Sequence, residues 1–241
     1  MTALLTIERV SKRFRGLTAV DNVSFAVPAG AIFAVIGPNG AGKTTLFNMI
    51  AGTMAPDGGA IIFAGNPIEG LSADAVCRRG IARTFQIVRP FPALTVEDNV
   101  TIGALLHRHD VGAARQRAQE LLRRLDLFDK RQRLASTLTL PDRKRLEVAR
   151  ALATGPQLLL LDEVMAGLRP TETDRMVAIL RELNRDSGLT ILLIEHVMRA
   201  VMALASHVLV LDHGVAIAEG TPDAIVRDPA VVQSYLGAEA V

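Results

Sequence analysis

The feature that most constrains this sequence is a glycine-rich segment, GPNGAGKTT, at residues 37–45. The apolar run AIFAVI precedes it at residues 31–36, and the run LFNMIA follows it at residues 46–51. A buried strand that leads through a glycine turn into a helix is the context in which this motif binds phosphate groups. An ordinary glycine-rich turn is the alternative, and the flanking strand and helix argue against it.

Each residue type in this loop suits a triphosphate with a bound metal ion. Gly37, Gly40 and Gly42 allow positive φ angles, so that backbone N–H groups and the helix N-terminus converge on one anion. Lys43 supplies a mobile positive charge for the β- and γ-phosphates, and the Thr44 hydroxyl is placed to bind Mg²⁺. The loop therefore predicts a nucleoside triphosphate and Mg²⁺ as ligands.

Length and composition narrow the class of protein. At 241 residues, the chain is long enough for one large domain, or for a core with a smaller lobe. Lys and Arg number 27 and Asp and Glu 25, a near balance that gives little support to nucleic-acid binding. The basic clusters at residues 78–79, 123–124 and 143–145 are expected on solvated helix faces. A hydrophobic content of 49% with 4% aromatic residues suits a sheet buried between aliphatic helices.

The remaining global features point to a soluble chain in a reducing compartment. The single cysteine, Cys77, cannot form an internal disulfide or a cysteine-based metal site, and we expect it to be a bystander. Glu8 and Arg9 interrupt the N-terminal segment, which lacks the pattern of a secretory signal. The apolar segments at residues 158–161 and 189–194 are too short to span a bilayer.

The order of apolar runs and turn residues predicts an α/β fold. Strands are expected at residues 4–10, 23–27, 60–64, 81–85, 158–161, 190–194, 207–212 and 215–219, with a turn-rich loop at residues 11–16. Helices are expected after the glycine-rich loop, from residue 72, from residue 95 to about residue 127, and at residues 142–153, 171–186, 197–204, 222–226 and 229–236.

Prolines mark a change in character along the chain. The segment Arg89-Pro90-Phe91-Pro92 breaks regular structure, and a helical pattern follows it. Residues 91–153 are therefore predicted to form a helical lobe, inserted into a core of residues 1–90 and 154–241. The whole of residues 1–241 is expected to form a single domain.

A second constellation follows a later apolar strand. Four leucines at residues 158–161 lead directly into Asp162 and Glu163. A run without polar residues suits a central parallel strand, and α/β sheets bind ligands at the carboxyl ends of such strands. Asp162 can hold Mg²⁺ directly or through water, and Glu163 can act as a general base toward water. Two ordinary surface charges would be the alternative, which fits poorly after four leucines.

Three further side chains are candidates, each with a structural alternative. His196 follows the strand at residues 190–194 and is placed to contact a γ-phosphate, although a lone histidine is usually structural. Gln86 ends another strand and is a candidate ligand of Mg²⁺ or of water. Phe14 precedes the glycine-rich loop and is a candidate to stack on a base, or else to pack in a hairpin.

Taken together, these segments resemble a known family. GPNGAGKTT, RTFQ, LLLLDE and LLIEH, in this order, are similar to the Walker A, Q-loop, Walker B and H-loop of the ATP-binding subunit of an ABC transporter. The resemblance covers nearly the whole chain. The segments VSKRFRGLTAVDNVSF, ARTFQIVRPFPALTVEDNV and AGLRPTET look most like the branched-chain amino-acid uptake group.

The resemblance implies a fold and a set of functional residues. The fold would be a P-loop NTPase core with a mainly parallel sheet, an N-terminal antiparallel β subdomain and an inserted helical lobe. ATP and Mg²⁺ would be the ligands, with Glu163, His196 and Gln86 as catalytic residues and Thr44, Gln86 and Asp162 around the metal ion. The implied nucleotide contacts are Phe14, Gly37, Pro38, Asn39, Gly40, Ala41, Gly42, Lys43, Thr44 and Thr45, with Thr139 acting on the nucleotide of a partner subunit.

The resemblance also implies partners and a location. The chain would pair head-to-tail with a second ATP-binding subunit around two ATP molecules and dock on transmembrane permease subunits near the Q-loop. It would lie peripherally on the cytoplasmic face of the inner membrane and serve an extracytoplasmic solute-binding protein indirectly. The expected activity is ATP hydrolysis that drives uptake of a branched-chain amino acid or a related small solute, with no role for nucleic acid.

One segment departs from the family pattern. Where the family has an LSGGQ-like or LSYGQ-like signature, this chain has Leu138-Thr139-Leu140-Pro141-Asp142. Thr139 keeps a hydroxyl, but Pro141 lacks a backbone N–H and Asp142 brings a negative charge near the partner's phosphate. Functional asymmetry is therefore expected, with a heterodimer favoured over a homodimer. The loop at residues 164–169 likewise lacks the proline and asparagine that are common there.

Other functions stay open from the sequence alone. An export or lipid-extraction ATPase of the same family is one alternative, and a non-transport ABC ATPase is another. About 120 residues separate the glycine-rich loop from Asp162, too few for a long coiled-coil insertion. A GTPase would need an Asn-Lys-x-Asp motif, which is absent from the sequence. A catalytically dead regulatory binder is favoured only by Pro141 and Asp142.

Overall fold

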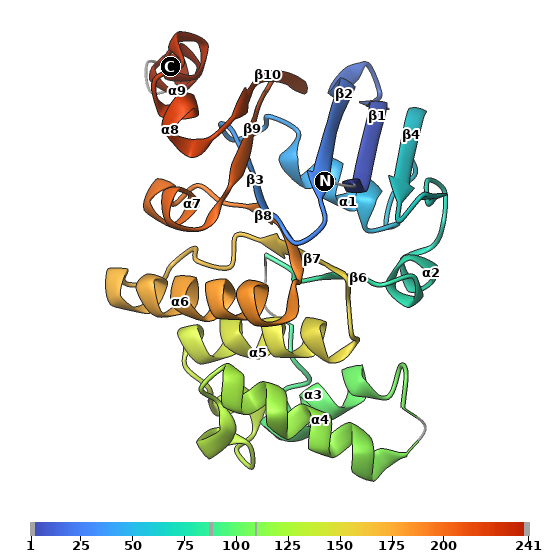
Figure 1. The fold of residues 1–241 in the computed structure, drawn as a ribbon, viewed down its shortest axis with the longest axis vertical. Coiled ribbons are helices and arrows are strands. Elements are labelled where there is room, and N and C mark those ends of the chain that lie inside the picture. Colours follow the sequence, from blue (N-terminus) through green and yellow to red (C-terminus); the bar gives the residue numbers. More distant parts are fainter. Residues whose placement is uncertain (1–2, 87–88, 109, 239–241) are drawn as a thin grey trace.

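The central element of the fold is a six-stranded sheet. The computed structural model describes residues 3–86, 89–108 and 110–238. The strand order in this sheet is β10-β9-β3-β8-β7-β6, and every pairing is parallel except that between β9 and β10. Its strands are β3 (Ile32–Ile36), β6 (Ile81–Arg83), β7 (Leu158–Asp162), β8 (Thr190–Ile194), β9 (His207–Asp212) and β10 (Val215–Gly220). The expected mainly parallel sheet is confirmed (Figure 1).

A second, antiparallel sheet has the order β2-β1-β4-β5. Its strands are β1 (Ala3–Phe14), β2 (Leu17–Pro28), β4 (Gly58–Phe63) and β5 (Asn66–Pro67). The expected loop at residues 11–16 is wrong, because β1 and β2 continue to a tight turn at Arg15 and Gly16. Both turn residues have positive φ, 44° and 98°, which suits a two-residue hairpin turn between right-twisted strands.

Helices cover the sheets and form a separate group at one end of the molecule. They are α1 (Lys43–Ile50), α2 (Ala73–Arg78), α3 (Val96–Ala104), α4 (Val111–Arg124), α5 (Leu140–Ala153), α6 (Pro170–Ser187), α7 (Met198–Leu204), α8 (Pro222–Val226) and α9 (Pro229–Ala238). In Figure 1, α3, α4 and α5 lie at the end opposite the antiparallel sheet. The division of the chain into a core and a helical lobe stays a prediction. In the described part of the chain, no helix is both long and apolar enough to cross a membrane.

The helical pattern expected from residue 95 to about residue 127 forms two helices, α3 and α4. Thr95 caps α3 by accepting a hydrogen bond from the Asp98 N–H at 3.0 Å, which agrees with a helix that starts at residue 95. Helix α4 has its own cap, because an Asp110 carboxylate oxygen accepts from the Ala113 N–H at 2.7 Å. A second N-cap within the helical pattern ends one helix and begins another.

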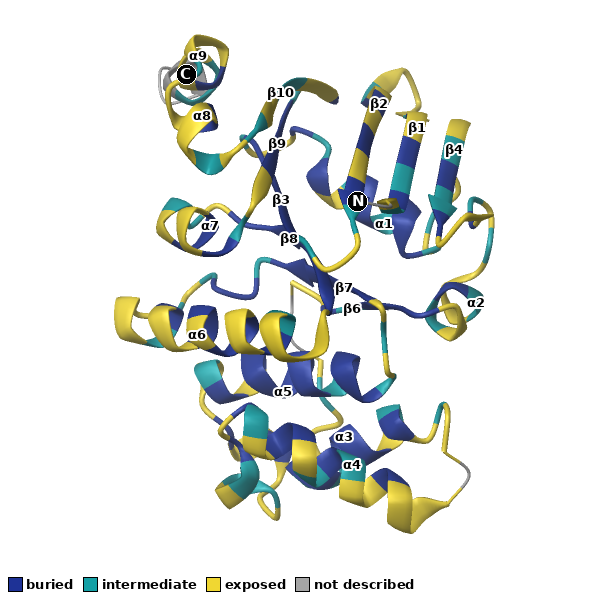
Figure 2. Ribbon diagram, viewed as in Figure 1, coloured by how far each residue is buried: buried dark blue, intermediate teal, exposed yellow. Residues whose placement is uncertain are grey.

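The parallel sheet separates two hydrophobic cores (Figure 2). Along β7, Leu159 and Leu161 pack into the core shared with helices α3–α7. Leu158 and Leu160 pack into the core shared with α1 and the antiparallel sheet. Successive side chains of a strand point to opposite faces, so a strand buried on both faces needs an unbroken apolar run. The four leucines therefore place Asp162 at the last position of β7 and Glu163 directly after the strand.

Candidate functional site

The glycine-rich loop lies between β3 and α1, as the sequence predicts. Two of its glycines are required by close backbone contacts. A Cβ on Gly37 would lie 2.0 Å from the Leu211 carbonyl oxygen, and a Cβ on Gly42 would lie 2.2 Å from the Ala19 carbonyl oxygen. Both have positive φ, 147° and 99°, which glycine adopts without strain. The tight approach brings the backbone of the loop and the N-terminus of α1 to one point.

Lys43, the first residue of α1, points back into the loop. Its Nζ donates to the carbonyl oxygens of Gly37 and Pro38 at 2.7 and 2.8 Å. Burial lowers the pKa of Lys43, while the negative charges of Glu163 and Asp162 act in the opposite direction. The ammonium is thus held inside the loop, near both carboxylates.

One cavity of about 470 Å³ joins most of the predicted nucleotide contacts. Phe14, at the end of β1, lies at this cavity with 41% of its surface exposed, so it is not a core residue. Its role as a base-stacking residue stays a prediction. The other lining residues are Leu17, Thr18, Ala19, Asn39, Gly40, Ala41, Gly42, Lys43, Thr44, Thr45, Gln86, Glu163 and His213. Of these, Leu17, Thr18, Ala19 and His213 were not predicted, because no motif marks them.

The two carboxylates at the end of β7 have different surroundings. Asp162 is almost fully buried, and its Oδ2 accepts a hydrogen bond from Arg83 at 2.7 Å. Glu163 follows with a positive φ of 48°, uncommon for a residue with a side chain. Its backbone N–H donates to the Ile194 carbonyl at 3.0 Å, which ties it to the neighbouring strand β8. The side chain of Glu163 thereby reaches the cavity that contains Lys43.

Gln86 and His196 both lie beside Glu163. Gln86 Nε2 donates to Glu163 Oε2 at 2.8 Å. His196 Nδ1 lies 3.9 Å from Glu163 Oε1, and the imidazole is 57% exposed. Parallel strands end at the same edge of the sheet, which explains why three residues far apart in the sequence meet there. A carboxylate flanked by an amide and an imidazole can accept a proton from a bound water molecule.

Thr139 lies away from this cavity, at the N-cap of α5. Its hydroxyl donates to Asp142 Oδ2 at 2.9 Å. The same carboxylate pairs with Lys130 and Arg145 at 2.5 Å each. Burial raises the pKa of Asp142, but the hydrogen bonds from Lys130 and Thr139 outweigh it and the net pKa lies below its ordinary value. The negative charge expected from Asp142 is therefore paired within the chain.

The basic cluster at residues 143–145 is only partly solvated, contrary to the prediction. Arg143 is exposed, but Lys144 and Arg145 are buried at 4% and 9% exposure. Lys144 Nζ donates to the Glu163 carbonyl oxygen at 2.9 Å and reaches the Gln86 carbonyl oxygen at 3.5 Å. The buried face of α5 thus places a cation behind the catalytic candidates. The sequence of this basic cluster does not indicate that Lys144 is buried against the carbonyl of Glu163.

Glu195 is another buried polar residue, which lies in the LLIEH segment but has no role predicted from the sequence. It is 1% exposed, and its Oε1 accepts from the Met165 N–H at 2.9 Å. Its Oε2 has no hydrogen-bond partner among the residues that the structure describes. Burial raises the pKa of Glu195 to about 7. A carboxyl group with this pKa changes its charge within the ordinary working range of pH.

The described residues fit a magnesium-bound nucleotide. The open Gly40 position, where a Cβ would meet no atom within 4 Å, leaves space above the loop. Within the described part of the chain, the hydrogen-bond acceptors of Lys43 Nζ are the loop's own carbonyl oxygens, so the ammonium can turn to phosphate oxygens. Thr44 offers an exposed hydroxyl that lines the cavity. Asp162 is almost fully buried and is not among the described residues that line this cavity, but its carboxylate is an oxygen ligand of the kind that Mg²⁺ prefers beside phosphates.

The chain is similar to known proteins over almost its full length. Residues 20–166 match the model of the ABC transporter family, and residues 217–241 match that of the branched-chain amino acid ATP-binding cassette transporter. The high-affinity branched-chain amino acid transport ATP-binding protein BraF of Pseudomonas aeruginosa is 37% identical, over 97% of this chain and 98% of that protein. The lipopolysaccharide export system ATP-binding protein LptB of Escherichia coli is 38% identical, over 98% of each chain. The structure of an ATP-binding cassette of an ABC transporter in its ADP conformation superposes with a TM-score of 0.89 at 31% identity, over 98% of this chain and all of that one.

Proposed function

The chain belongs to the ABC transporter family of ATP-binding proteins, and we propose that its own P-loop and the β7 carboxylates form a working Mg-ATP hydrolysis site. The observation that carries the proposal is the cavity in which Lys43, Thr44, Gln86 and Glu163 meet. Residues from the loop and from the end of β7, about 120 positions apart in the sequence, converge there. This agrees with the name of BraF, a transport ATP-binding protein, and with the match to the ABC transporter family.

Each residue has a distinct part in the proposed mechanism. Lys43 and the N–H groups of the loop bind the phosphate oxygens and neutralise their charge. When bound, Mg²⁺ would draw charge from the β- and γ-phosphates, with Thr44 and Asp162 as its protein ligands. Glu163 accepts a proton from the attacking water, and Gln86 holds its Oε2 in place. His196 orients that water or the terminal phosphate.

The solute is proposed to be a branched-chain amino acid or a related small solute. Support comes from BraF, named for that transport, and from the match of residues 217–241 to the branched-chain cassette model. A second candidate is an export function, because LptB of an export system is 38% identical. ATPase stimulation in membranes that contain the cognate permease, with leucine or with lipopolysaccharide supplied, distinguishes the two.

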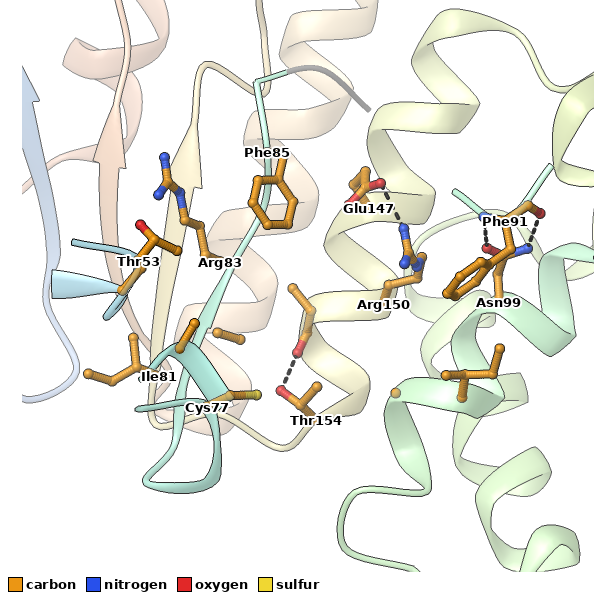
Figure 3. Close-up of a pocket in the computed structure, with 16 residues that line it drawn as sticks. Thr53, Cys77, Ile81, Arg83, Phe85, Phe91, Asn99, Glu147, Arg150 and Thr154 are labelled. Carbon is orange, nitrogen blue, oxygen red and sulfur yellow. Dashed lines mark hydrogen bonds and ion pairs between the residues drawn. The ribbon is translucent and has the colours of Figure 1, made fainter. Parts of the chain in front are cut away.

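A groove next to the site is proposed as the contact with the permease. This cavity of about 310 Å³ lies between the end of β6 and helices α3 and α5 (Figure 3). Phe85, Phe91 and Ile102 line it and are 52%, 44% and 44% exposed. Exposed aromatic and aliphatic side chains around a groove are typical of a docking site for another protein.

Contacts within the chain hold one wall of the groove in place, the wall that contains Phe91, Asn99 and Arg150. Asn99 donates to the Phe91 carbonyl and accepts from the Phe91 N–H, at 3.0 and 2.8 Å. The Arg150 guanidinium lies 5.0 Å from the Phe91 ring centre and pairs with Glu147 at 2.9 Å. A wall fixed in this way loses little conformational freedom when a partner binds.

Calorimetry tests the nucleotide site directly. The purified chain should bind Mg-ATP, and Lys43→Ala should remove most of the affinity because it deletes the only side-chain cation seen in the loop. Arg185→Ala is a matched control, since Arg185 is exposed and its one ion pair among the described residues is with its neighbour Asp186. If the wild-type chain binds no Mg-ATP, or Lys43→Ala binds it equally well, the proposed function is wrong.

The working assembly is proposed to contain a second, different ATP-binding subunit. Thr139 would act on the nucleotide of that partner, yet its hydroxyl is bound to Asp142 at 2.9 Å. Pro141 follows in the first turn of α5 and has no N–H to offer. The partner would therefore donate an intact signature to the P-loop of this chain, which keeps the complete set of its own residues. Peripheral attachment to the cytoplasmic face of the membrane through the permease, with a solute-binding protein outside, completes the proposal.

A further inference from the structure

Arg83, at the end of β6, links the predicted metal site to the P-loop helix. Its NH2 donates to Asp162 Oδ2 at 2.7 Å, and its NH1 donates to Asn48 Oδ1 at 2.6 Å. The side chains of Arg83 and Asp162 are 10% and 3% exposed. A largely buried pair of this kind has little access to water, so loss of Arg83 leaves the Asp162 carboxylate without its hydrogen-bonded cation. One guanidinium thus joins β6, β7 and α1.

The same side chain forms part of the wall of the proposed docking groove. Arg83, Phe85 and Thr53 lie on one side of that cavity in Figure 3, with Phe91 and Asn99 on the other. The Phe85 ring centre is 5.7 Å from the Arg83 guanidinium carbon, within the range of a cation–π contact. The buried Phe47 ring lies on the same guanidinium at 6.0 Å. Phe85 is therefore exposed to a groove partner and in contact with Arg83.

We propose that Arg83 is a positioning residue that orients the Asp162 carboxylate toward Mg²⁺ and links metal binding to occupation of the groove through Phe85. The inference rests on the proposed function. With Oδ2 held by Arg83, Asp162 keeps Oδ1 for the metal ion or its water. A groove partner that displaces Phe85 removes its ring from the Arg83 guanidinium. Because that guanidinium holds Asp162 Oδ2, the orientation of the Asp162 carboxylate then changes as well. Coupling of this kind is reciprocal, so metal-nucleotide binding also changes the affinity of the groove.

Direct metal binding tests the positioning role. Mn²⁺ serves as the probe, and electron paramagnetic resonance measures its affinity for the full chain saturated with a non-hydrolysable ATP analogue. Arg83→Met should weaken Mn²⁺ binding by about tenfold or more, as loss of a residue that orients a metal ligand typically does. Arg83→Lys, which keeps the charge but not both hydrogen bonds, should restore part of the affinity. Affinity for the analogue in EDTA should change by less than about twofold in both variants, since neither touches the P-loop amides.

A second pair of variants tests the link to the groove. Phe85→Ala removes the ring over the guanidinium and should weaken Mn²⁺ binding about two- to fivefold, the loss expected for a cation–π contact. Ile102→Ala is the control, because Ile102 lines the same groove with 44% exposure and lies on α3. It should leave Mn²⁺ affinity unchanged.

Several outcomes would overturn the inference. Unchanged Mn²⁺ affinity in Arg83→Met would do so, and so would an equal loss of metal-free analogue binding, which indicates general damage. Equal effects of Phe85→Ala and Ile102→Ala would remove the link to the groove. Should Arg83→Met fail to fold, Arg83→Lys decides, because a lysine cannot donate to Asp162 and Asn48 in the fixed geometry of a guanidinium, and wild-type Mn²⁺ affinity there contradicts the positioning role. A wild-type chain that binds no nucleotide contradicts the proposed function instead.

Discussion

Glu163 is oriented through its backbone as well as through its side chain. The residue has a positive φ of 48°. Its N–H donates to the Ile194 carbonyl oxygen, and its own carbonyl oxygen accepts from Lys144 Nζ. Its side chain accepts from Gln86 at 2.8 Å. A residue in a sparsely populated conformation persists only where its surroundings hold it there. Glu163, the proposed general base, is thus positioned by β8, α5 and the segment after β6 together.

Replacement of Glu163 by glutamine should separate binding from hydrolysis. The amide keeps the shape of the side chain but cannot accept the proton of water, so the rate of ATP hydrolysis should fall by about 10²- to 10⁴-fold. Mg-ATP affinity should hold or rise slightly, since a negative charge near the phosphates is removed. A phosphate-release assay and calorimetry measure the two quantities. Glu182→Gln, at an exposed position of α6, should change neither; equal turnover in Glu163→Gln and wild type would exclude the base role.

Lys144 should affect turnover without touching the nucleotide. In Lys144→Met the carbonyl of Glu163 loses a charged hydrogen bond, worth about 1.5–3 kcal/mol. We expect kcat to fall by about tenfold or more while KM stays nearly constant, because the base loses its alignment and the phosphate contacts remain. Arg143→Met is the matched control on the same helix, where the side chain is exposed. An equal loss in both variants would indicate damage to α5 as a whole.

The sequence predicts site residues that belong to a recognisable motif, but it does not reveal those whose contacts depend on being buried in the fold. Lys43, Glu163 and Gln86 were predicted because each stands at a recognisable place in a strand, turn or helix pattern. No such pattern indicates a role for Arg83 or Lys144, because the sequence does not distinguish a buried basic residue from a solvated one. Only the fold shows that their partners, Asp162 and the Glu163 carbonyl, lie beside them.

At the scale of elements, apolar periodicity predicts the parallel sheet well. The run at residues 158–161 is unbroken because β7 has a core on each face, and β8 shows the same pattern. Boundaries were harder to predict. The β1–β2 hairpin extends into the supposed loop, since pairing with a partner strand stabilises polar residues that local pattern assigns to a turn. The Asp110 cap between α3 and α4 was the available sign of a break.

Glu195, directly after β8, should make stability depend on pH. Burial raises its folded pKa from 4.5 to about 7, with Glu163 adding to the effect and Lys144 opposing it. The folded state therefore keeps a proton that the unfolded chain releases between these two values. Stability from this group is fully present below pH 4.5 and is lost as the pH rises toward about 7, by about 3 kcal/mol in total.

The variant Glu195→Gln tests this pH dependence. The neutral amide has no such titration, so its free energy of unfolding relative to wild type should rise between about pH 5 and about pH 8. Urea denaturation at intervals across that range measures the difference. Glu182→Gln should give a curve parallel to wild type, because its side chain is exposed. A constant offset for Glu195→Gln across the range would show that the carboxyl does not titrate there.

At the scale of the whole molecule, the P-loop residues that would bind this chain's own nucleotide and the segment that would contact the partner's nucleotide lie at different cavities. The P-loop cavity holds Lys43 and Glu163, whereas Thr139 lines a separate cavity of about 330 Å³ with Lys130, Asp142 and Arg145. The positive N-terminus of α5 already has its own carboxylate, Asp142, in its first turn. A phosphate from another subunit would compete with that carboxylate for the same positive groups. On the proposed function, one molecule thus offers a P-loop side, where Lys43 and Glu163 share a cavity, and a signature side, where Asp142 already occupies the N-terminus of α5.

Association of the chain with itself should therefore be weak. With Glu163→Gln to block hydrolysis, light scattering in saturating Mg-ATP should report a monomer, because each site of a homodimer would receive the Pro141-Asp142 segment. Adding Pro141→Gly and Asp142→Gln restores a backbone N–H and releases the Thr139 hydroxyl, so an ATP-dependent dimer should appear.

The matched control for this experiment is Arg143→Gln in the Glu163→Gln background, a change at an exposed position of the same helix. It should leave the protein monomeric. Removal of Asp142 also frees Lys130 and Arg145, so Pro141→Gly alone, which keeps their ion pairs, serves as the variant of smaller structural effect. An ATP-dependent homodimer of Glu163→Gln with the native segment would contradict the asymmetry, because it would require the α5 N-terminus to accept a second anion beside Asp142.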